Sequence, residues 1–320
     1  MAPRTPTASR SPASAEARER TLELIREVRR IEIQTSRLVD QHLAGSYQSA
    51  FKGQGVAFAE VRAYEPGDDV RTIDWNVTAR TGIPHIKLFS EERELTVMLV
   101  VDMSASLDLG SRDADKRRLV ARLAATFAFS AIRNNDSVGL LGFTDRVEAF
   151  VPPRSGRKHV LAVVQRVLSH EPSGRGTDPA AALEYMARIG RRNAVVIVIS
   201  DFLDAVGPEE DSRFERALKL VRRGNDVIPV RVEDPLELGM PALGLVAVED
   251  LELLELGGDR FIDLSRGRQA RFKAEVQRER ERFDALMRRL RLETMTVSCG
   301  TAWQQPLVQF FRHRARRMRR

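Results

Sequence analysis

The sequence predicts an α/β protein with a doubly wound, mostly parallel sheet, preceded by an N-terminal helical arm and a small β-rich extension. Two segments, Thr96 to Val101 and Ala194 to Ser200, are almost continuously apolar, as expected of strands buried on both faces of a parallel sheet. Between and after them, segments with helical spacing alternate with further strand-like segments. This alternation is typical of a parallel sheet covered by helices on both faces.

The α/β domain is expected to span residues 95–300. Apolar patterning and turn residues set the order of its elements. We expect strands at 96–101, 138–143, 147–151, 194–200, 226–232 and 294–299, and helices at 113–135, 158–168, 179–189, 212–223 and 268–291.

Two segments precede the extension. Residues 1–15 combine Pro with Ser, Thr and Ala and lack the apolar content that offsets ordering entropy, so we expect a disordered tail. Residues 16–45 carry Leu24, Val28, Ile31 and Leu38 at helical spacing, and Gly45 stands where such a helix would end. This segment is therefore predicted to be an amphipathic helical arm.

The β-rich extension covers residues 46–94. Short β-type segments alternate there with turn residues at Pro66 to Asp69 and at Thr81-Gly82. Its charged and aromatic residues allow two interpretations: a docking surface, or a turn followed by a packed Trp75 with local ion pairs. The residues concerned are Asp68, Asp69, Arg71, Asp74 and Trp75.

Composition excludes several classes of protein. The 320 residues are 42% hydrophobic, which supports a substantial core and excludes a wholly disordered chain. The apolar runs are shorter than the roughly 18 residues of a membrane-spanning helix, and the first residues contain no hydrophobic signal core. The single cysteine, Cys299, forms neither an intrachain disulfide nor a thiolate zinc site, and is more typical of a small buried side chain. We therefore expect a cytoplasmic protein.

The basic charge is concentrated at the end of the chain, in residues 301–320. The formal net charge is +7, and six arginines in the last nine residues account for +6 of it. Aromatic residues are only 6% of the chain and do not alternate with basic ones, so nucleic-acid binding is not expected. Trp303, Leu307, Phe310 and Phe311 approach helical spacing. The segment is thus either a helix packed on the sheet with its arginines solvated, or a peripheral contact with an anionic membrane or polymer.

Polar residues follow both buried strands. The first strand leads into Asp102, Ser104 and Ser106, the second ends at Ser200-Asp201, and Thr177 precedes a predicted helix. In an open parallel sheet, ligands bind at the carboxyl ends of the strands. An oxygen-only set of hydroxyls and carboxylates suits Mg²⁺ or Mn²⁺ and not zinc or copper. The alternatives are a helix cap for Thr177, an ordinary turn residue for Asp102 and a simple strand end for Asp201.

These residues carry a resemblance to known families. The pattern Asp102-x-Ser104-x-Ser106, then Thr177, then Asp201, resembles the metal-ion-dependent adhesion site of von Willebrand factor A-type domains. The run from Phe58 to Trp75, with Thr78-Ala79-Arg80 and Lys87-Leu88-Phe89 after it, resembles the bacterial family known as domain of unknown function 58.

The resemblance implies a von Willebrand factor A-like fold and a role for each site residue. Ser104, Ser106 and Thr177 would bind Mg²⁺ directly, and Asp102 and Asp201 would hold metal-bound waters or switch inward to the metal. An acidic side chain of a protein partner would complete the coordination. The family also implies a MoxR-type AAA+ ATPase as the partner.

We therefore expect a non-enzymatic, Mg²⁺-dependent protein-interaction module, an adaptor or co-chaperone of a MoxR-type ATPase. The sequence contains no GxxxxGK[ST], HExxH or GxSxG motif. The alternative is a metal-dependent phosphoryl hydrolase in which Asp178 or Asp204 acts as general base.

Overall fold

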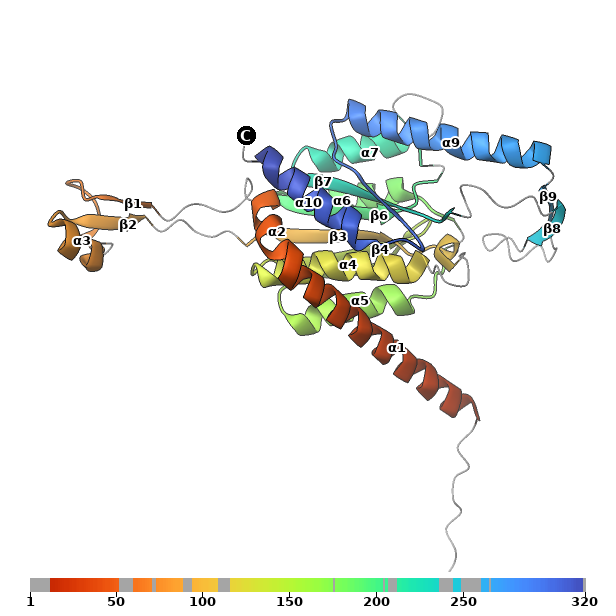
Figure 1. Cartoon of the computed structure of the whole chain (residues 1–320), viewed down its shortest axis with the longest axis horizontal. Coiled ribbons are helices and arrows are strands. Elements are labelled where there is room, and N and C mark those ends of the chain that lie inside the picture. The colour runs from red at the N-terminus through yellow and green to blue at the C-terminus, as the bar shows by residue number, and fades with distance from the viewer. Residues whose placement is uncertain are drawn as a thin grey trace, which may run out of the picture.

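The computed structural model has a central six-stranded sheet with helices on both faces (Figure 1). The strand order is β10-β7-β6-β3-β4-β5, in which only β5 is antiparallel to its neighbour. The predicted doubly wound, mostly parallel sheet is therefore confirmed. The structure describes residues 12–51, 60–70, 73–88, 94–108, 116–174, 176–203, 205–206, 212–235, 244–248, 260–264 and 266–318.

The strands of the sheet lie where apolar patterning places them. From Val97 on, every residue of β3 is buried, and so is the whole of β6, because both strands are covered on two faces. The strands are β3 (Thr96–Asp102), β4 (Ser137–Phe143), β5 (Val147–Arg154), β6 (Ala194–Ser200), β7 (Asp226–Glu233) and β10 (Met295–Ser298).

Two apolar cores lie on opposite faces of the sheet. One contains Val97, Leu99 and Val101 with the N-terminal helices, α4 (Lys116–Arg133), α5 (Arg157–Ser169) and α10 (Gln304–Met318). The other contains Met98 and Val100 with α6 (Pro179–Ile189), α7 (Arg213–Arg222) and α9 (Arg266–Arg289). Alternate residues of β3 thus point into different cores, as strand geometry requires.

The N-terminal arm is longer than the sequence indicated. It comprises α1 (Pro12–Leu38), a π-helical turn η1 (Val39–Leu43) and α2 (Ala44–Phe51), so the helix starts within the expected tail and Gly45 does not end it. Tyr47 and Phe51 are buried and their rings contact Phe311 of α10. This packing offsets the low helix propensity of glycine.

The extension forms a small separate unit of β1 (Glu60–Ala63), α3 (Trp75–Thr81) and β2 (His85–Leu88) (Figure 1). The expected local ion pair exists, because Arg62 contacts both carboxylate oxygens of Asp68. Asp74 caps α3 by accepting backbone N–H bonds. Trp75 is 70% exposed, which corrects the interpretation of a packed tryptophan. Arg71 lies outside the described residues.

The C-terminal segment is a helix packed on the sheet, as one of the two interpretations predicted. Trp303, which directly precedes α10, and Leu307 and Phe311 within it are buried. The arginines do not all stay solvated, however: Arg314 is 4% exposed, pairs with Asp226 and Glu293, and lies over the ring of Phe51. A binding mode that uses all six terminal arginines on one anionic ligand is therefore excluded.

Three further elements complete the described part. A hairpin of β8 (Gly244–Val248) and β9 (Arg260–Leu264), and the short 3-10 helix η4 (Ala105–Asp108), lie where the sequence showed no regular pattern. Cys299 is buried, as predicted. Within the described residues, no helix combines the length and the apolar character needed to span a bilayer.

Candidate functional site

The site lies at the carboxyl edge of the sheet, between β3 and β6. The chain passes from β3 outward through β4 to β5, then returns to the other side of β3 as β6. This reversal creates a topological switch point, the position at which open parallel sheets typically bind ligands. The sequence places Asp102 and Ser200 at the ends of these strands.

Asp102 is the last residue of β3 and is completely buried. Its Oδ1 accepts a hydrogen bond from the backbone N–H of Ser104 (2.9 Å), and its Oδ2 accepts one from the hydroxyl of Ser200 (2.7 Å). Burial and the nearby Asp201 carboxylate raise the pKa of Asp102 to about 6, although these hydrogen bonds act to lower it. Without a compensating positive charge, ionised Asp102 is thus destabilised where it lies.

Ser104 and Ser106 present their hydroxyls at the same point. Their Oγ atoms are 2.8 Å apart and share one hydrogen bond. Ser104 is buried, whereas Ser106 on η4 is partly exposed, so the cluster reaches the surface at Ser106. Both hydroxyls have lone pairs in excess of this single bond, which a cation can use.

Asp201 follows β6 and faces a buried lysine. Lys116, the first residue of α4, has a side chain with no exposed surface, and its Nζ lies 3.2 Å from Oδ2 of Asp201. The other carboxylate oxygen of Asp201 accepts the backbone N–H of Leu203. A positive charge of the protein itself therefore lies within this acidic cluster.

Thr177 lies in the loop between α5 and α6, and the end of β4 anchors this loop. The backbone N–H of Asp178 donates to the carbonyl of Thr144 (2.8 Å). Asp178, not Thr177, is the N-cap of α6, so the helix-cap alternative for Thr177 is excluded. Between described residues, no hydrogen bond joins the Thr177 side chain to Asp102, Ser104 or Asp201.

Glu148 of β5 clamps the same loop. Its carboxylate accepts hydrogen bonds from the Thr144 hydroxyl, the Ser173 N–H and hydroxyl, and the Gly174 N–H. Burial raises the pKa of Glu148, but these hydrogen bonds outweigh it and lower the pKa to about 2. Glu148 is consequently a permanently charged anchor for the segment that carries Thr177.

Of the two general bases considered for a hydrolase, the structure describes only Asp178. Asp178 uses one carboxylate oxygen to cap α6, through the N–H of Ala181, and the other to pair with Arg213. A carboxylate held in this way is poorly placed to accept a proton from water. Asp204 lies outside the described residues.

Sequence reasoning missed three residues of this region. Lys116 and Glu148 were not singled out because their partners, Asp201 and Ser173, are distant in the sequence. Ser200 was noticed only as part of a strand end, although it bonds to Asp102 directly. The available signal for Glu148 was a charged residue inside the largely apolar strand β5, whereas Lys116 begins α4 beside two arginines and gave no such signal.

The donor set fits a hard divalent cation. The available donors are hydroxyl and carboxylate oxygens, which Mg²⁺ and Mn²⁺ prefer. Two carboxylates buried close together also favour bound positive charge, and the raised pKa of Asp102 reflects the cost of ionising that residue where it lies. Among the described residues, no three His, Cys, Asp or Glu side chains converge on one point. Direct binding of a divalent cation would therefore depend on the hydroxyls of Ser104, Ser106 and Thr177.

Comparison with solved structures gives matches of limited similarity. One is BatB from Bacteroides thetaiotaomicron, with a TM-score of 0.41 and 16% sequence identity; the match covers 69% of this chain and 99% of that one. An aerotolerance-related membrane protein from Bacteroides fragilis has a TM-score of 0.42 and 17% identity, covering 70% and 99%. A von Willebrand factor type A protein from Catenulispora acidiphila has a TM-score of 0.36 and 12% identity, covering 70% and 42%.

Sequence comparison gives a firmer assignment. Uncharacterized proteins of Mycobacterium bovis and Mycobacterium tuberculosis are 34% identical to this chain over 227 residues, which is 70% of this chain and 70% of each relative. The family described as protein of unknown function DUF58 matches residues 60–291, a range that includes the extension, the site and most of the sheet. The chain therefore belongs to the DUF58 family.

Proposed function

We propose that this protein is a cation-dependent protein-interaction module whose carboxyl-edge site takes an acidic side chain of a partner. The observation that carries the proposal is the convergence of the Ser104 and Ser106 hydroxyls with the buried Asp102 and Asp201 at the switch point. Such an arrangement of neutral oxygen donors beside buried carboxylates is chemically suited to bind Mg²⁺ or Mn²⁺.

Each residue has a distinct role in the proposal. Ser104, Ser106 and Thr177 would hold the cation directly, and Asp102 and Asp201 would hold its waters by hydrogen bonds. Bound Mg²⁺ supplies a Lewis-acidic position for an incoming carboxylate. Because Ser106 is the partly exposed member of the cluster, we expect the partner to approach beside η4.

For the partner, the family resemblance favours a MoxR-type AAA+ ATPase, with this protein as adaptor or co-chaperone. An acidic residue on the ATPase would occupy the exposed side of the cation. The role is one of binding, because the side chains around the cluster are engaged in structural hydrogen bonds and ion pairs, as Asp178 illustrates.

Calorimetry with Mg²⁺ or Mn²⁺ tests the cation site. We expect one divalent site in the wild-type protein and none in Ser104→Ala/Ser106→Ala. The matched control is Ser137→Ala, which removes a hydroxyl at the opposite edge of the sheet and should bind the cation normally. Equal uptake by wild type and the double variant would refute the site.

A pull-down with the MoxR-type ATPase, in Mg²⁺ and in EDTA, tests the partner. Loss of one half of a desolvated charged contact costs about 2 to 5 kcal/mol, so EDTA or Asp102→Ala should weaken the complex at least about 30-fold. Equal recovery in both buffers would exclude docking through the cation and would favour binding through the extension.

A further inference from the structure

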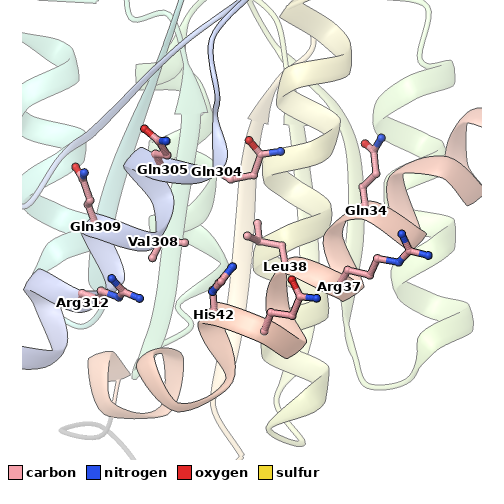
Figure 2. Close-up of a pocket in the computed structure, with 10 residues that line it drawn as sticks. Gln34, Arg37, Leu38, His42, Gln304, Gln305, Val308, Gln309 and Arg312 are labelled. Atoms are coloured by element: carbon pink, nitrogen blue, oxygen red, sulfur yellow. The ribbon is translucent and has the colours of Figure 1, made fainter.

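A groove lies between the N-terminal and C-terminal helices, with a cavity volume of about 440 Å³ (Figure 2). Side chains of α1 and η1 form one wall, and side chains of α10 form the other. Leu38 and Val308 contribute its apolar surface. The polar lining residues are Gln34, Arg37, Gln41 and His42 on the first wall and Gln304, Gln305, Gln309 and Arg312 on the second.

The groove has a basic and amide-rich lining. Arg37 and Arg312 stand on opposite walls (Figure 2), and within the described part of the chain no Asp or Glu lines the groove. The five glutamines each offer one carbonyl acceptor and two N–H donors, and all five are exposed. An occupant with negative charge and its own hydrogen-bonding groups is therefore favoured over an apolar one.

The polar groups of the groove are not used within the protein. Among the described residues, neither Arg37 nor Arg312 takes part in an ion pair or a side-chain hydrogen bond, and the same holds for the five glutamines. Arginines nearby behave differently: Arg314 of α10 pairs with Asp226 and Glu293, and Arg157 of α5 pairs with Glu32 of α1.

We propose that this groove binds an acidic peptide segment of a protein partner. Carboxylates of the segment would pair with Arg37 and Arg312 across the groove, and the glutamine carboxamides would bond to its backbone N–H and C=O groups. A carboxamide matches a peptide backbone because both carry a donor and an acceptor, whereas a phosphate chain offers acceptors only. An acidic peptide would therefore have a binding partner for the glutamine carboxamides of the groove as well as for its two arginines.

The groove is distinct from the carboxyl-edge site in its composition and in its place in the sequence. Both walls lie outside residues 60–291, the range matched by the DUF58 family. The proposal therefore adds a second contact that belongs to the N-terminal and C-terminal helices of this chain. It does not depend on a bound cation.

Fluorescence anisotropy on the full chain tests the groove. The probe is a short glutamate-rich peptide with blocked termini and a fluorescent label, compared with the same peptide carrying Gln at every Glu position. We expect the acidic peptide to bind, the neutral one to bind at least about tenfold more weakly, and EDTA to have no effect on either.

Two variants and one control distinguish binding in the groove from non-specific attraction to positive charge. Arg37→Ala/Arg312→Ala should weaken binding about tenfold. Gln309→Glu, a nearly isosteric change of an exposed side chain, places a carboxylate in the groove and should weaken binding as well. The control, Arg29→Ala/Arg316→Ala, removes the same charge from exposed positions outside the groove and should leave binding within twofold.

Several results would overturn the proposal. Equal weakening by the groove variant and the control would show non-specific attraction. Equal binding of the acidic and neutral peptides would remove the role of the arginines. If phosphatidylserine vesicles or duplex DNA bound the wild type and lost affinity in the groove variant, while the peptide did not, the groove would be a site for anionic lipid or nucleic acid instead.

Discussion

At the amino edge of the central sheet, buried carboxylates hold the protein together, whereas at the carboxyl edge they are crowded against each other. Asp136 at the amino edge accepts the Leu95 N–H (2.9 Å) and the Tyr47 hydroxyl (3.0 Å), which joins α2 to the sheet. At the carboxyl edge, burial and the nearby Asp201 carboxylate raise the pKa of Asp102 to about 6. Asp136 bonds to two groups that belong to other elements of the fold, whereas Asp102 lies beside a second carboxylate and the hydroxyls of the candidate site.

The cations at the two edges show the same contrast. Arg314 at the amino edge contacts Asp226, Glu293 and the Ala50 carbonyl. It therefore joins α10 to the start of β7, to the segment before β10 and to α2. Lys116 at the carboxyl edge lies against Asp201, inside the cluster proposed to bind a divalent ion. The first charge is structural, and we expect the second to oppose the ion.

The largest expected effect is at the amino edge. Arg314→Met leaves Asp226 and Glu293 without their buried partner and should lower the free energy of unfolding by about 3 to 5 kcal/mol. Arg316→Met, on an exposed position of the same helix, should change it by less than about 0.5 kcal/mol. Urea unfolding measures both, and similar losses in the two variants would contradict a structural role for Arg314.

Lys116→Met tests whether the buried lysine at the carboxyl edge competes with a bound cation. Without metal, the unpaired Asp201 should lower the free energy of unfolding by about 3 kcal/mol. Mg²⁺ at about 100 times its Kd should restore about 2.7 kcal/mol. Mg²⁺ should also bind the variant more tightly than wild type in calorimetry, because a competing charge is gone. Identical Mg²⁺ affinity and identical stabilisation in both proteins would show that Lys116 and the cation do not interact.

The pH dependence of stability tests the buried carboxylate at the amino edge. Burial raises the pKa of Asp136 to about 6, despite the hydrogen bonds from Leu95 and Tyr47. A raised carboxyl pKa favours the protonated form in the folded state, so its stabilising contribution is complete below about pH 4 and is lost as pH rises through 6. Asp136→Asn removes this titration.

Urea unfolding between pH 4 and pH 7 measures the effect. Relative to Asp136→Asn, the wild type should lose about 2 kcal/mol across this range. Asp102 titrates in both proteins and cancels in the difference. Parallel pH profiles for the two proteins would show that Asp136 is not protonated near pH 6.

The smallest effect is expected in the loop that carries Thr177. A Cβ on Gly174 would lie 2.0 Å from Oγ1 of Thr144 and 2.1 Å from Oδ1 of Asp145, so Gly174→Ala must displace the loop. We expect a loss of about 1 kcal/mol and a several-fold weaker cation affinity. At Gly176 the nearest atom would be 3.8 Å away, so Gly176→Ala is the matched control. Unchanged cation affinity in Gly174→Ala would argue against Thr177 as a ligand.

Much of the sheet could be predicted from local pattern. Continuous apolar segments identified β3 and β6 because strands buried on both faces have no polar side to alternate with. The placement of Asp102, Ser104 and Asp201 at one edge followed from the same reasoning, since parallel strands have their carboxyl ends together. The metal-binding role of these residues remains a prediction.

Other features could not be predicted because they depend on distant contacts. Gly45 is a helix terminator by propensity, yet it lies in α2 because Tyr47 and Phe51 pack against Phe311. Arg314 belongs to a basic run typical of a solvated tail, and only its proximity to Asp226 shows that it is buried and paired.

The class of fold, the succession of strands and helices along the chain and the residue types at the carboxyl edge could all be predicted from local sequence. These properties depend on periodicity and residue type, which act over a few residues. Three features follow only from the folded arrangement: Lys116 faces Asp201, Glu148 holds the loop of Thr177, and helices near the two ends of the chain enclose a basic groove. These are contacts between residues far apart in the chain, which packing of the helices on the sheet brings together.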